Sequence, residues 1–349
     1  MNKPRYFKEA FAQLKPYEPH LVSYEIKLDA NENPYLFPKS LLEEIFSKIG
    51  TRDFPLYPDP LAGRLRIRLS EKLGVLPENI VLGNGSDELI LCLYLAFGGY
   101  GRIALSFSPS FVMYRHHAFV TQTEFFEVSY RDDFSLDLDE TKKAIEKYQP
   151  HLVFLANPNN PTGTLVDIET IKKLLAYDHL LVVDEAYVEF SGVSAIDLLK
   201  KYQNLVILRT FSKARALAGL RLGYLVASVD VVKEIIKVKN PYNVNVFSQI
   251  AGEVVLANEE VFQGEIKEIV AERERLYNQL ASLGLKPVKS HANFILVEFG
   301  EKAKKIHQEL INHGILVRYL GGALANYLRI TVGTPEENRQ LLKKLGEIL

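Results

Sequence analysis

The sequence is poor in three features that would each indicate a particular class of protein. It has one cysteine, Cys92, in 349 residues, so no internal disulfide can form, and this usage fits a reducing cytoplasm. The formal net charge is −1, which gives no electrostatic reason to expect nucleic acid or an acidic membrane as a partner. No apolar run approaches the roughly 20 residues that span a bilayer, and the N-terminus lacks the apolar segment of a signal peptide. We therefore expect a cytoplasmic protein without nucleic-acid or membrane partners.

The sequence does contain a regular alternation of short apolar segments with amphipathic segments of about ten residues, which begins near residue 41. Such alternation predicts an α/β fold, with a mostly parallel sheet covered by helices on both faces. One long helix is expected from about 248 to 281, followed by further strands and helices. We predict an N-terminal arm over 1–30, a large domain over 31–250, and a smaller C-terminal α/β domain over 251–349 that begins with the long helix.

Polar residues follow several of the predicted strands, where open α/β sheets bind their ligands. The sequence GNGSDE at 83–88 opens a helix, and its N-terminal N–H groups would suit a phosphate. A simple turn and helix cap would explain the same residues. The sequence NPNNPTG at 157–163 follows another strand, and it either forms a rigid turn or directs an amide at a ligand.

Two charged residues at strand ends need a partner. Asp184 follows the apolar LLVV, and a buried carboxylate requires either a lysine or arginine or another cation, such as a protonated ring nitrogen. Lys213 and Arg221 lie in RTFSKARALAGLRLGY, which is either a solvated loop or the attachment site of an anionic cofactor. Four neighbouring strand ends thus offer a lysine, a carboxylate, a tyrosine, an asparagine and two possible phosphate-binding sites. This set matches the needs of pyridoxal 5'-phosphate.

The same motifs resemble those of the fold-type I pyridoxal-phosphate-dependent aminotransferases over nearly the whole chain. NPNNPTG, DEAY and SKA followed by GLRLGY are typical of the fold type, whereas ANENP, YPDP and RITVGTPEEN are similar to the histidinol-phosphate aminotransferase family. This resemblance implies a large sheet domain, a smaller C-terminal domain and bound pyridoxal 5'-phosphate.

The resemblance also implies roles for individual residues. Lys213 resembles the lysine that holds the cofactor covalently, and Asp184 resembles the partner of its ring nitrogen. Tyr187 and Asn160 resemble the pair at the ring oxygen. Lys213, Asp184 and Tyr187 are the expected catalytic residues. The other expected cofactor-binding residues are Gly85, Ser86, Asp87, Phe111, Thr210, Ser212 and Arg221, with Phe111 in place of a ring-stacking tyrosine.

Further residues are implied for the substrate and for a partner subunit. Arg318 and Arg329 resemble the arginines that bind the substrate anion, and Tyr17, like Asn160, is expected at the substrate pocket. Tyr57 resembles a tyrosine that reaches the cofactor phosphate of a neighbouring subunit, which implies a homodimer. No residue is assigned as a metal ligand.

The implied activity is reversible transfer of an amino group between L-histidinol phosphate and 2-oxoglutarate. The products are imidazole acetol phosphate and L-glutamate, and the reaction belongs to histidine biosynthesis. Three alternatives stay open at this point. They are an aromatic amino acid aminotransferase, a threonine-phosphate decarboxylase of the same fold, and a nucleotide-binding dehydrogenase or non-enzymatic binding module that uses the turn at 83–85. A catalytically inactive regulator is disfavoured, because every cofactor position is filled.

Overall fold

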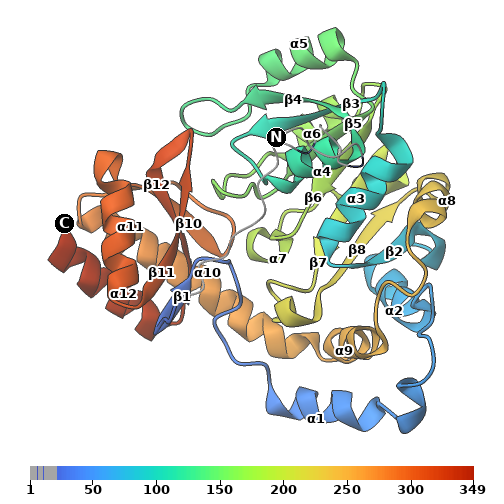
Figure 1. Cartoon of the computed structure of the whole chain (residues 1–349), viewed down its shortest axis with the longest axis horizontal. Helices are drawn as coiled ribbons and strands as arrows, with labels where there is room; N and C mark the ends of the chain where they lie inside the picture. The colour runs from blue at the N-terminus through green and yellow to red at the C-terminus, as the bar shows by residue number, and fades with distance from the viewer. Residues whose placement is uncertain (1–5, 7–10, 12–21) are drawn as a thin grey trace.

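The computed structural model describes residues 6, 11 and 22–349. Its larger sheet has seven strands (Figure 1). After β2, at one edge of this sheet, the chain passes to β3 and β4 at the opposite edge. All neighbouring strands run parallel except β8, which is antiparallel to both of its neighbours. The expected mostly parallel sheet is therefore confirmed. In spatial order the strands are β2 (Ile80–Asn84), β8 (Leu222–Ala227), β7 (Leu205–Thr210), β6 (Leu180–Asp184), β5 (Leu152–Ala156), β3 (Ile103–Ser108) and β4 (Glu124–Ser129).

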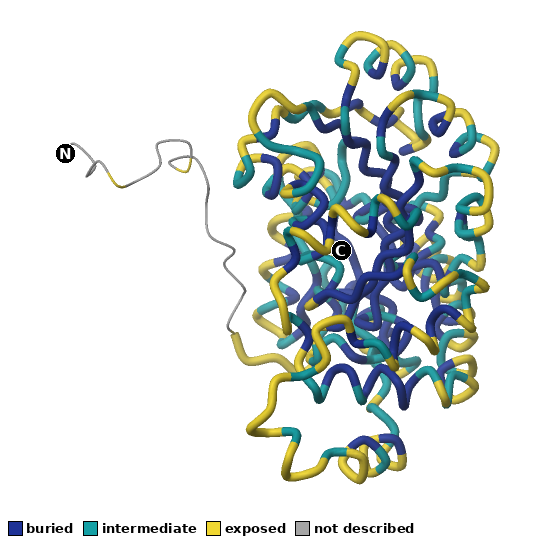
Figure 2. The backbone as a smooth tube through the Cα atoms, turned by 90° about the vertical axis from the view of Figure 1, so that its right-hand side faces the viewer, coloured by how far each residue is buried: buried dark blue, intermediate teal, exposed yellow. Residues whose placement is uncertain are grey.

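Helices cover both faces of this sheet, and the strands at its centre are buried (Figure 2). Side chains alternate between the two faces, so that Val182 packs on one side while Leu181 and Val183 pack on the other. One face carries α3 (Ser86–Phe97), α4 (Met113–Thr121) and α8 (Val229–Val238). The opposite face carries α1 (Lys39–Lys48), α2 (Gly63–Leu73), α5 (Leu138–Tyr148), α6 (Ile168–Leu174) and α9 (Val246–Ala257).

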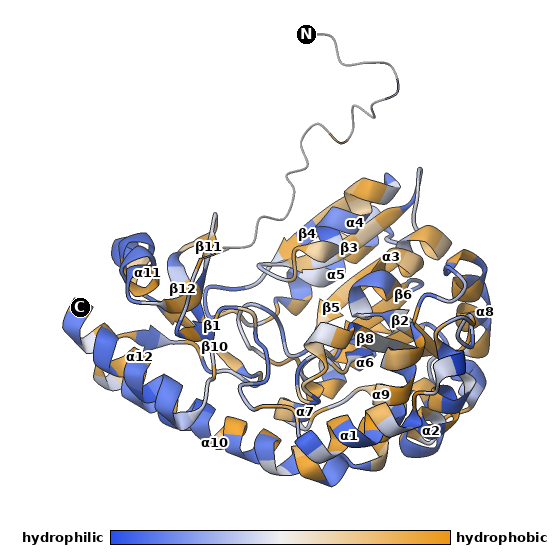
Figure 3. Cartoon of the chain, turned by 60° about the horizontal axis from the view of Figure 1, so that its bottom comes forward, coloured by the Kyte–Doolittle hydropathy of each residue, from blue (hydrophilic) through white to orange (hydrophobic). Residues whose placement is uncertain are grey.

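A second sheet of five strands is built mostly from the C-terminal part of the chain (Figure 1). Its order is β1 (Ile26–Leu28), β11 (Ile315–Gly321), β12 (Leu324–Thr331), β10 (Phe294–Glu298) and β9 (Lys286–Pro287). It packs with α10 (Glu259–Ser282), α11 (Ala303–Asn312) and α12 (Pro335–Ile348), whose outer surfaces are hydrophilic (Figure 3). Because β1 pairs in parallel with β11, the residues directly after β1 are brought between the two sheets.

Short helical segments complete the described chain. They are α7 (Val188–Ser191) and the 3-10 turns η2 (Thr51–Asp53), η3 (Pro77–Asn79), η4 (Ile196–Lys200), η5 (Ala218–Leu220) and η6 (Gly300–Lys302). None of the helices formed by residues 22–349 is both long enough and apolar enough to cross a bilayer.

The prediction of a single long helix from about 248 to 281 is wrong, because the helix is interrupted at Asn258, between α9 and α10. Asn258 has φ −127° and ψ 37°, outside the helical region. Its side-chain amide donates to the Val254 carbonyl at 2.9 Å and to the Glu44 carboxylate at 3.3 Å. The local sequence has no proline to mark this break, so the apolar pattern continued across it.

The four strand ends expected to be neighbours do not all lie next to one another. The ends of β5, β6 and β7 do, but β8 lies between β7 and β2. Because β8 is antiparallel, it begins at the edge where β2 and β7 end. Arg221, which directly precedes β8, is thereby delivered to the same edge as the start of α3.

Candidate active site

A cavity of about 300 Å³ lies where the carboxyl ends of the parallel strands face the smaller sheet. Residues from both sheets line it, as expected for a ligand site in an open α/β fold. The predicted site residues that the fold brings to its wall are Ser86, Asp87, Phe111, Asn160, Asp184, Tyr187, Thr210, Ser212, Lys213, Arg221, Arg318 and Arg329.

Lys213 lies in the loop after β7, and its amine faces the cavity. Its Nζ donates a hydrogen bond to the carbonyl of Ala30 at 2.9 Å, which ties it to the segment after β1. Burial, together with the nearby charges of Arg329 and Arg221, lowers the pKa of Lys213 to about 8. A larger fraction of this amine is therefore uncharged near neutral pH than for an ordinary lysine, and only the uncharged form is nucleophilic.

Asp184 ends β6 and is almost fully buried, with 5% of its surface exposed. Burial raises the pKa of Asp184 to about 6, although hydrogen bonds from Tyr114 and the Ala186 N–H oppose this rise. Within the described part of the chain, no lysine or arginine forms an ion pair with this carboxylate. The explanation of Asp184 as half of an internal ion pair therefore does not hold for these residues, and a protonated ring nitrogen as its partner stays a prediction.

The next residue, Glu185, behaves differently. It points away from the cavity into a buried ion pair with Arg209, whose Nη2 lies 2.8 Å from the carboxylate. The Ser194 hydroxyl and the Ala195 N–H also donate to Glu185. These bonds tie the end of β6 to β7, and thus fix the strand that presents Asp184 beside the strand that leads to Lys213.

Several donors gather at the start of α3. Gly85 has φ +80°, and a Cβ at this position would lie 2.7 Å from Arg221 Nη2, so glycine allows the guanidinium to approach the turn. Arg221 also contacts the Asp87 carboxylate at 3.4 Å. Thr210 and Ser212 bond to each other at 2.9 Å. Hydroxyls, a guanidinium and a helix N-terminus together suit a phosphate group.

Tyr187 and Asn160 face the cavity from the loops after β6 and β5. The Tyr187 hydroxyl accepts a hydrogen bond from the Asn31 side chain at 3.0 Å. The Asn160 carbonyl oxygen accepts one from Arg329 at 2.7 Å. Asn160 therefore links the large sheet to the arginine of the smaller one.

The three asparagines of NPNNPTG have different functions. Asn157 exchanges two hydrogen bonds with the Val166 backbone, and Asn159 bonds to Ser110 and Thr162. Of the three, Asn160 lines the cavity, whereas the first two amides belong to the rigid turn. The rigid turn is therefore observed, and an amide directed at a ligand stays a prediction for Asn160.

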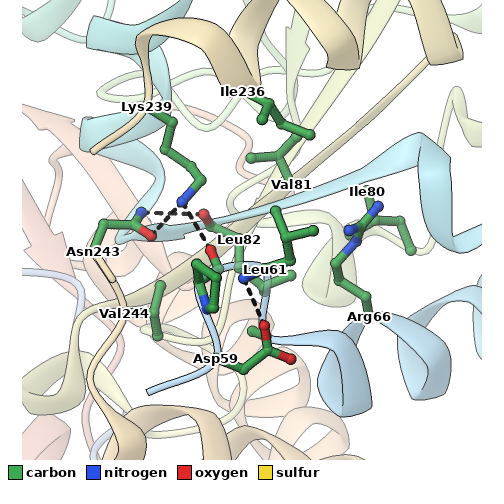
Figure 4. A pocket seen from close by; sticks show the side chains of 12 residues that line it. Asp59, Leu61, Arg66, Ile80, Val81, Leu82, Ile236, Lys239, Asn243 and Val244 are labelled. Atoms are coloured by element: carbon green, nitrogen blue, oxygen red, sulfur yellow. Dashed lines mark hydrogen bonds between the residues drawn. The ribbon is translucent and has the colours of Figure 1, made fainter. Parts of the chain in front are cut away.

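Tyr57 and Gly85 do not line the cavity, and Tyr17 lies outside the described residues. Tyr57 is 81% exposed and stacks on Tyr242, with ring centroids 4.6 Å apart. The loop that follows Tyr57 is held by Lys239. Its Nζ donates to the Pro60 carbonyl at 3.1 Å and to the Asn243 side chain at 2.8 Å (Figure 4).

Asn243 extends this network to α3, since its amide donates to the Glu88 carboxylate at 2.6 Å. Glu88 also accepts from the Asn84 N–H at 2.6 Å. The small cavity drawn in Figure 4 measures about 10 Å³, which is room for one water at most. This region therefore acts as packed structure between the Tyr57 loop and the start of α3.

Sequence reasoning missed several residues of the cavity. Asp29, Ala30 and Asn31 enter it from the segment after β1, and Tyr114 enters from α4. The motif ANENP was noticed, but nothing in the local sequence shows that this segment meets Lys213. Tyr114 ends the motif SPSFVMY at 108–114, but it was given no role, because nothing in the local sequence shows that its hydroxyl meets Asp184. Among the described residues, no group of three or more histidine, cysteine, aspartate or glutamate side chains could hold a metal ion.

Comparison with known proteins identifies the family of this chain. The family model described as aminotransferase class I and II matches residues 24–345. A histidinol-phosphate aminotransferase of Thermoanaerobacter pseudethanolicus is 41% identical over 346 residues, with 98% of each chain covered.

Solved structures give the same result. The histidinol-phosphate aminotransferase of Sinorhizobium meliloti, in complex with pyridoxal-5'-phosphate, superposes with a TM-score of 0.90 at 28% identity, covering 99% of this chain and 98% of that one. The L-threonine-O-3-phosphate decarboxylase of Porphyromonas gingivalis has a TM-score of 0.80 at 25% identity, covering 93% and 99%. The chain belongs to the class I and II aminotransferases and, within them, to the histidinol-phosphate aminotransferase family.

Proposed function

We propose that this protein is a histidinol-phosphate aminotransferase, which moves an amino group between L-histidinol phosphate and 2-oxoglutarate in histidine biosynthesis. One observation carries the proposal. A single cavity has an amine of lowered pKa and a buried carboxylate on its large-sheet side, and two arginines on its small-sheet side. The first pair suits amino-group chemistry, and the second suits a substrate that ends in an anion.

The cavity fits pyridoxal 5'-phosphate. The buried Asp184 lacks an ion-pair partner among the described residues, and a protonated ring nitrogen would supply one. Ser86, Thr210, Ser212 and Arg221 would hold the phosphate, Phe111 would cover the ring, and Tyr187 with Asn160 would bind the ring oxygen. When bound, the cofactor supplies an aldehyde that accepts the amino group and a ring that withdraws electrons from the substrate Cα.

Lys213 performs the proton transfers at Cα. Its amine is partly uncharged at neutral pH, so it can remove a proton from Cα of the amino donor as a general base. Asp184, held by β6, keeps a proton at the ring nitrogen. The same amine would hold the cofactor covalently between turnovers, and without cofactor it donates a hydrogen bond to the Ala30 carbonyl.

Arg329 and Arg318 bind the substrate anion. The same planar guanidinium geometry accepts the phosphate of histidinol phosphate and the carboxylates of glutamate and 2-oxoglutarate. Two amino donors that share the reacting amino group and an anion, but little else, can therefore use one cavity in turn. Tyr17 is proposed to complete this pocket.

We further propose a homodimer in which Tyr57 reaches the cofactor phosphate of the other subunit. Supporting this, Tyr57 is exposed and lies outside its own cavity, and neighbouring apolar side chains are also exposed, with Phe54 at 81% and Leu56 at 64%. We retain the division into an arm (1–30), a large domain (31–250) and a small domain (251–349), and the cytoplasm as the location, in keeping with the single buried cysteine.

The test is a steady-state assay with three amino donors: histidinol phosphate, phenylalanine and threonine phosphate. We expect kcat/KM with 2-oxoglutarate to be highest for histidinol phosphate. Preference for phenylalanine would indicate an aromatic aminotransferase, and release of carbon dioxide from threonine phosphate would indicate a decarboxylase, which the similarity to such an enzyme makes worth testing. A protein that lacks a borohydride-sensitive visible absorption band and binds a dinucleotide would contradict the cofactor assignment.

A further inference from the structure

Tyr114 occupies a position in the cavity wall that no part of the mechanism above uses. It lies near the start of α4 and is 1% exposed. Its hydroxyl donates to Asp184 Oδ2 at 2.7 Å, while the Ala186 N–H donates to Oδ1 at 3.1 Å. Each oxygen of the carboxylate thus has one donor, and the carboxylate cannot rotate without losing both bonds.

The Tyr114 ring is itself held by two aromatic neighbours. It stacks on Phe154 with centroids 5.0 Å apart, and it meets Phe111 edge-on at 5.6 Å. Phe111 is the residue proposed to cover the cofactor ring. One side chain therefore supports both the stacking face and the partner of the ring nitrogen.

The electrostatic surroundings of Asp184 make this hydrogen bond important. Burial favours the neutral carboxyl most strongly, and two acidic neighbours, Asp87 on α3 and Glu185 directly after β6, act in the same direction. Tyr130 and Tyr187 are the other titratable groups that act on Tyr114, and neither is a cation. The hydrogen bond from the Tyr114 hydroxyl stabilises the ionised form of Asp184 and so opposes its protonation.

We propose that Tyr114 is a positioning residue, which keeps the Asp184 carboxylate ionised and aimed at the cofactor's ring nitrogen. The inference rests on the proposed use of pyridoxal 5'-phosphate, but not on which amino donor the enzyme prefers. It predicts that Tyr114 sets the lowest pH at which the protein binds its cofactor well, because a neutral carboxyl cannot pair with a protonated ring.

The test uses Tyr114→Phe, which removes the hydroxyl and keeps the ring, and the matched control Tyr94→Phe. Tyr94 is equally buried and stacks on Phe154 at the same 5.0 Å, but its hydroxyl has no hydrogen-bond partner in the described part of the chain. The dissociation constant of pyridoxal 5'-phosphate is measured for each full-length protein, after removal of bound cofactor, between pH 5 and pH 9.

In the unchanged protein we expect affinity to fall as the pH drops through about 6, where Asp184 becomes protonated. In Tyr114→Phe the fall should occur about one pH unit higher, so that affinity at pH 6 is about fivefold weaker than in Tyr94→Phe. In an Asp184→Asn background, Tyr114→Phe should cause no further change. The cofactor's own ionisation affects every variant equally and cancels in the comparison.

A purely structural function of Tyr114 would weaken binding by the same factor at every pH and leave the midpoint unchanged, and that result would overturn the inference. An equal midpoint shift in Tyr94→Phe would overturn it as well. Failure of the proposed function is seen separately. If the unchanged protein binds the cofactor but does not use histidinol phosphate, the substrate assignment fails while the midpoint comparison still decides the role of Tyr114.

Discussion

Arg318 and Arg329 lie directly opposite each other on the antiparallel strands β11 and β12. Residues opposite each other in such a pair project from the same face of the sheet, and like charges in this position repel. Both side chains line the cavity. An anion bound between them would relieve the repulsion, which supports the proposal that these two strands bind the substrate anion.

The two arginines should differ in what they recognise. Arg329 is 8% exposed and already bonds to Asn160 and to the Asp29 carbonyl, so Arg329→Ala should lower kcat/KM for both half-reactions. Loss of a buried charge-assisted contact costs about 2–5 kcal/mol. Arg318→Ala should reduce kcat/KM more for histidinol phosphate than for glutamate. The two half-reactions are measured separately at fixed ionic strength, and an equal effect of Arg318→Ala on both donors would contradict its selectivity for phosphate.

Replacing Lys213 by alanine should abolish transamination while the protein remains folded. No other lysine lines the cavity, so nothing among the described residues can replace its amine. Single-turnover kinetics with histidinol phosphate measure the loss, and circular dichroism with thermal melting checks the fold. Activity within about tenfold of the unchanged enzyme, a barrier change of only about 1.4 kcal/mol, would remove Lys213 from the mechanism.

The pH dependence of Lys213 can be followed without cofactor. Because burial and the charges of Arg329 and Arg221 lower the pKa of Lys213 to about 8, its uncharged fraction should rise through pH 8. The rate of its reaction with an amine-specific acylating reagent, followed by peptide mass spectrometry, should have its midpoint there. Arg329→Gln removes a nearby positive charge and should move the midpoint upward. A midpoint near the ordinary lysine value of about 10.4 would show that burial has little effect.

Asp184→Asn should leave the fold intact and slow removal of the Cα proton by orders of magnitude. A neutral amide has nearly the same shape as the carboxylate but cannot stabilise a positive charge on the ring nitrogen. The rate is measured by exchange of the substrate Cα hydrogen with solvent deuterium. Normal exchange in Asp184→Asn would show that the ring nitrogen does not depend on this residue.

The buried pair formed by Glu185 and Arg209 should matter for stability more than for substrate choice. Glu185→Gln leaves Arg209 buried beside a neutral group, which should cost about 3–5 kcal/mol in free energy of unfolding. The exposed pair Asp197–Lys200 is the control, and Asp197→Asn should cost less than about 1 kcal/mol. Urea denaturation compares the two variants, and equal losses would contradict this ranking.

The sequence predicts best the positions of residues that directly follow an apolar strand segment. Lys213 and Asp184 each follow an apolar strand, and the ends of parallel strands meet at one edge of a sheet, so their proximity follows from the pattern. The position of Arg221 could not be predicted in this way, because Arg221 reaches the site only through the antiparallel direction of β8. That direction depends on pairing between segments far apart in the chain.

Other features could not be read from the local pattern. Ala30 and Asn31 reach the cavity because β1 pairs with β11, almost 290 residues further along the chain. The sequence around Tyr114 does not show that its hydroxyl has a partner. The fold alone brings Asp184 within hydrogen-bond distance of it. At the break between α9 and α10, the Asn258 side chain bonds to Glu44 in a distant helix, a contact that the local sequence does not show.

The network of Lys239, Asn243 and Glu88 has a consequence for how two copies of the chain would meet. Partly buried hydrogen bonds in this network join the loop that follows Tyr57 to the first turn of α3, so they hold this loop in place within a single subunit. A preformed loop loses little conformational entropy on docking, and its backbone moves little. In the proposed homodimer, each subunit would therefore offer its neighbour a rigid projection, and recognition would depend on shape complementarity rather than on folding at the interface.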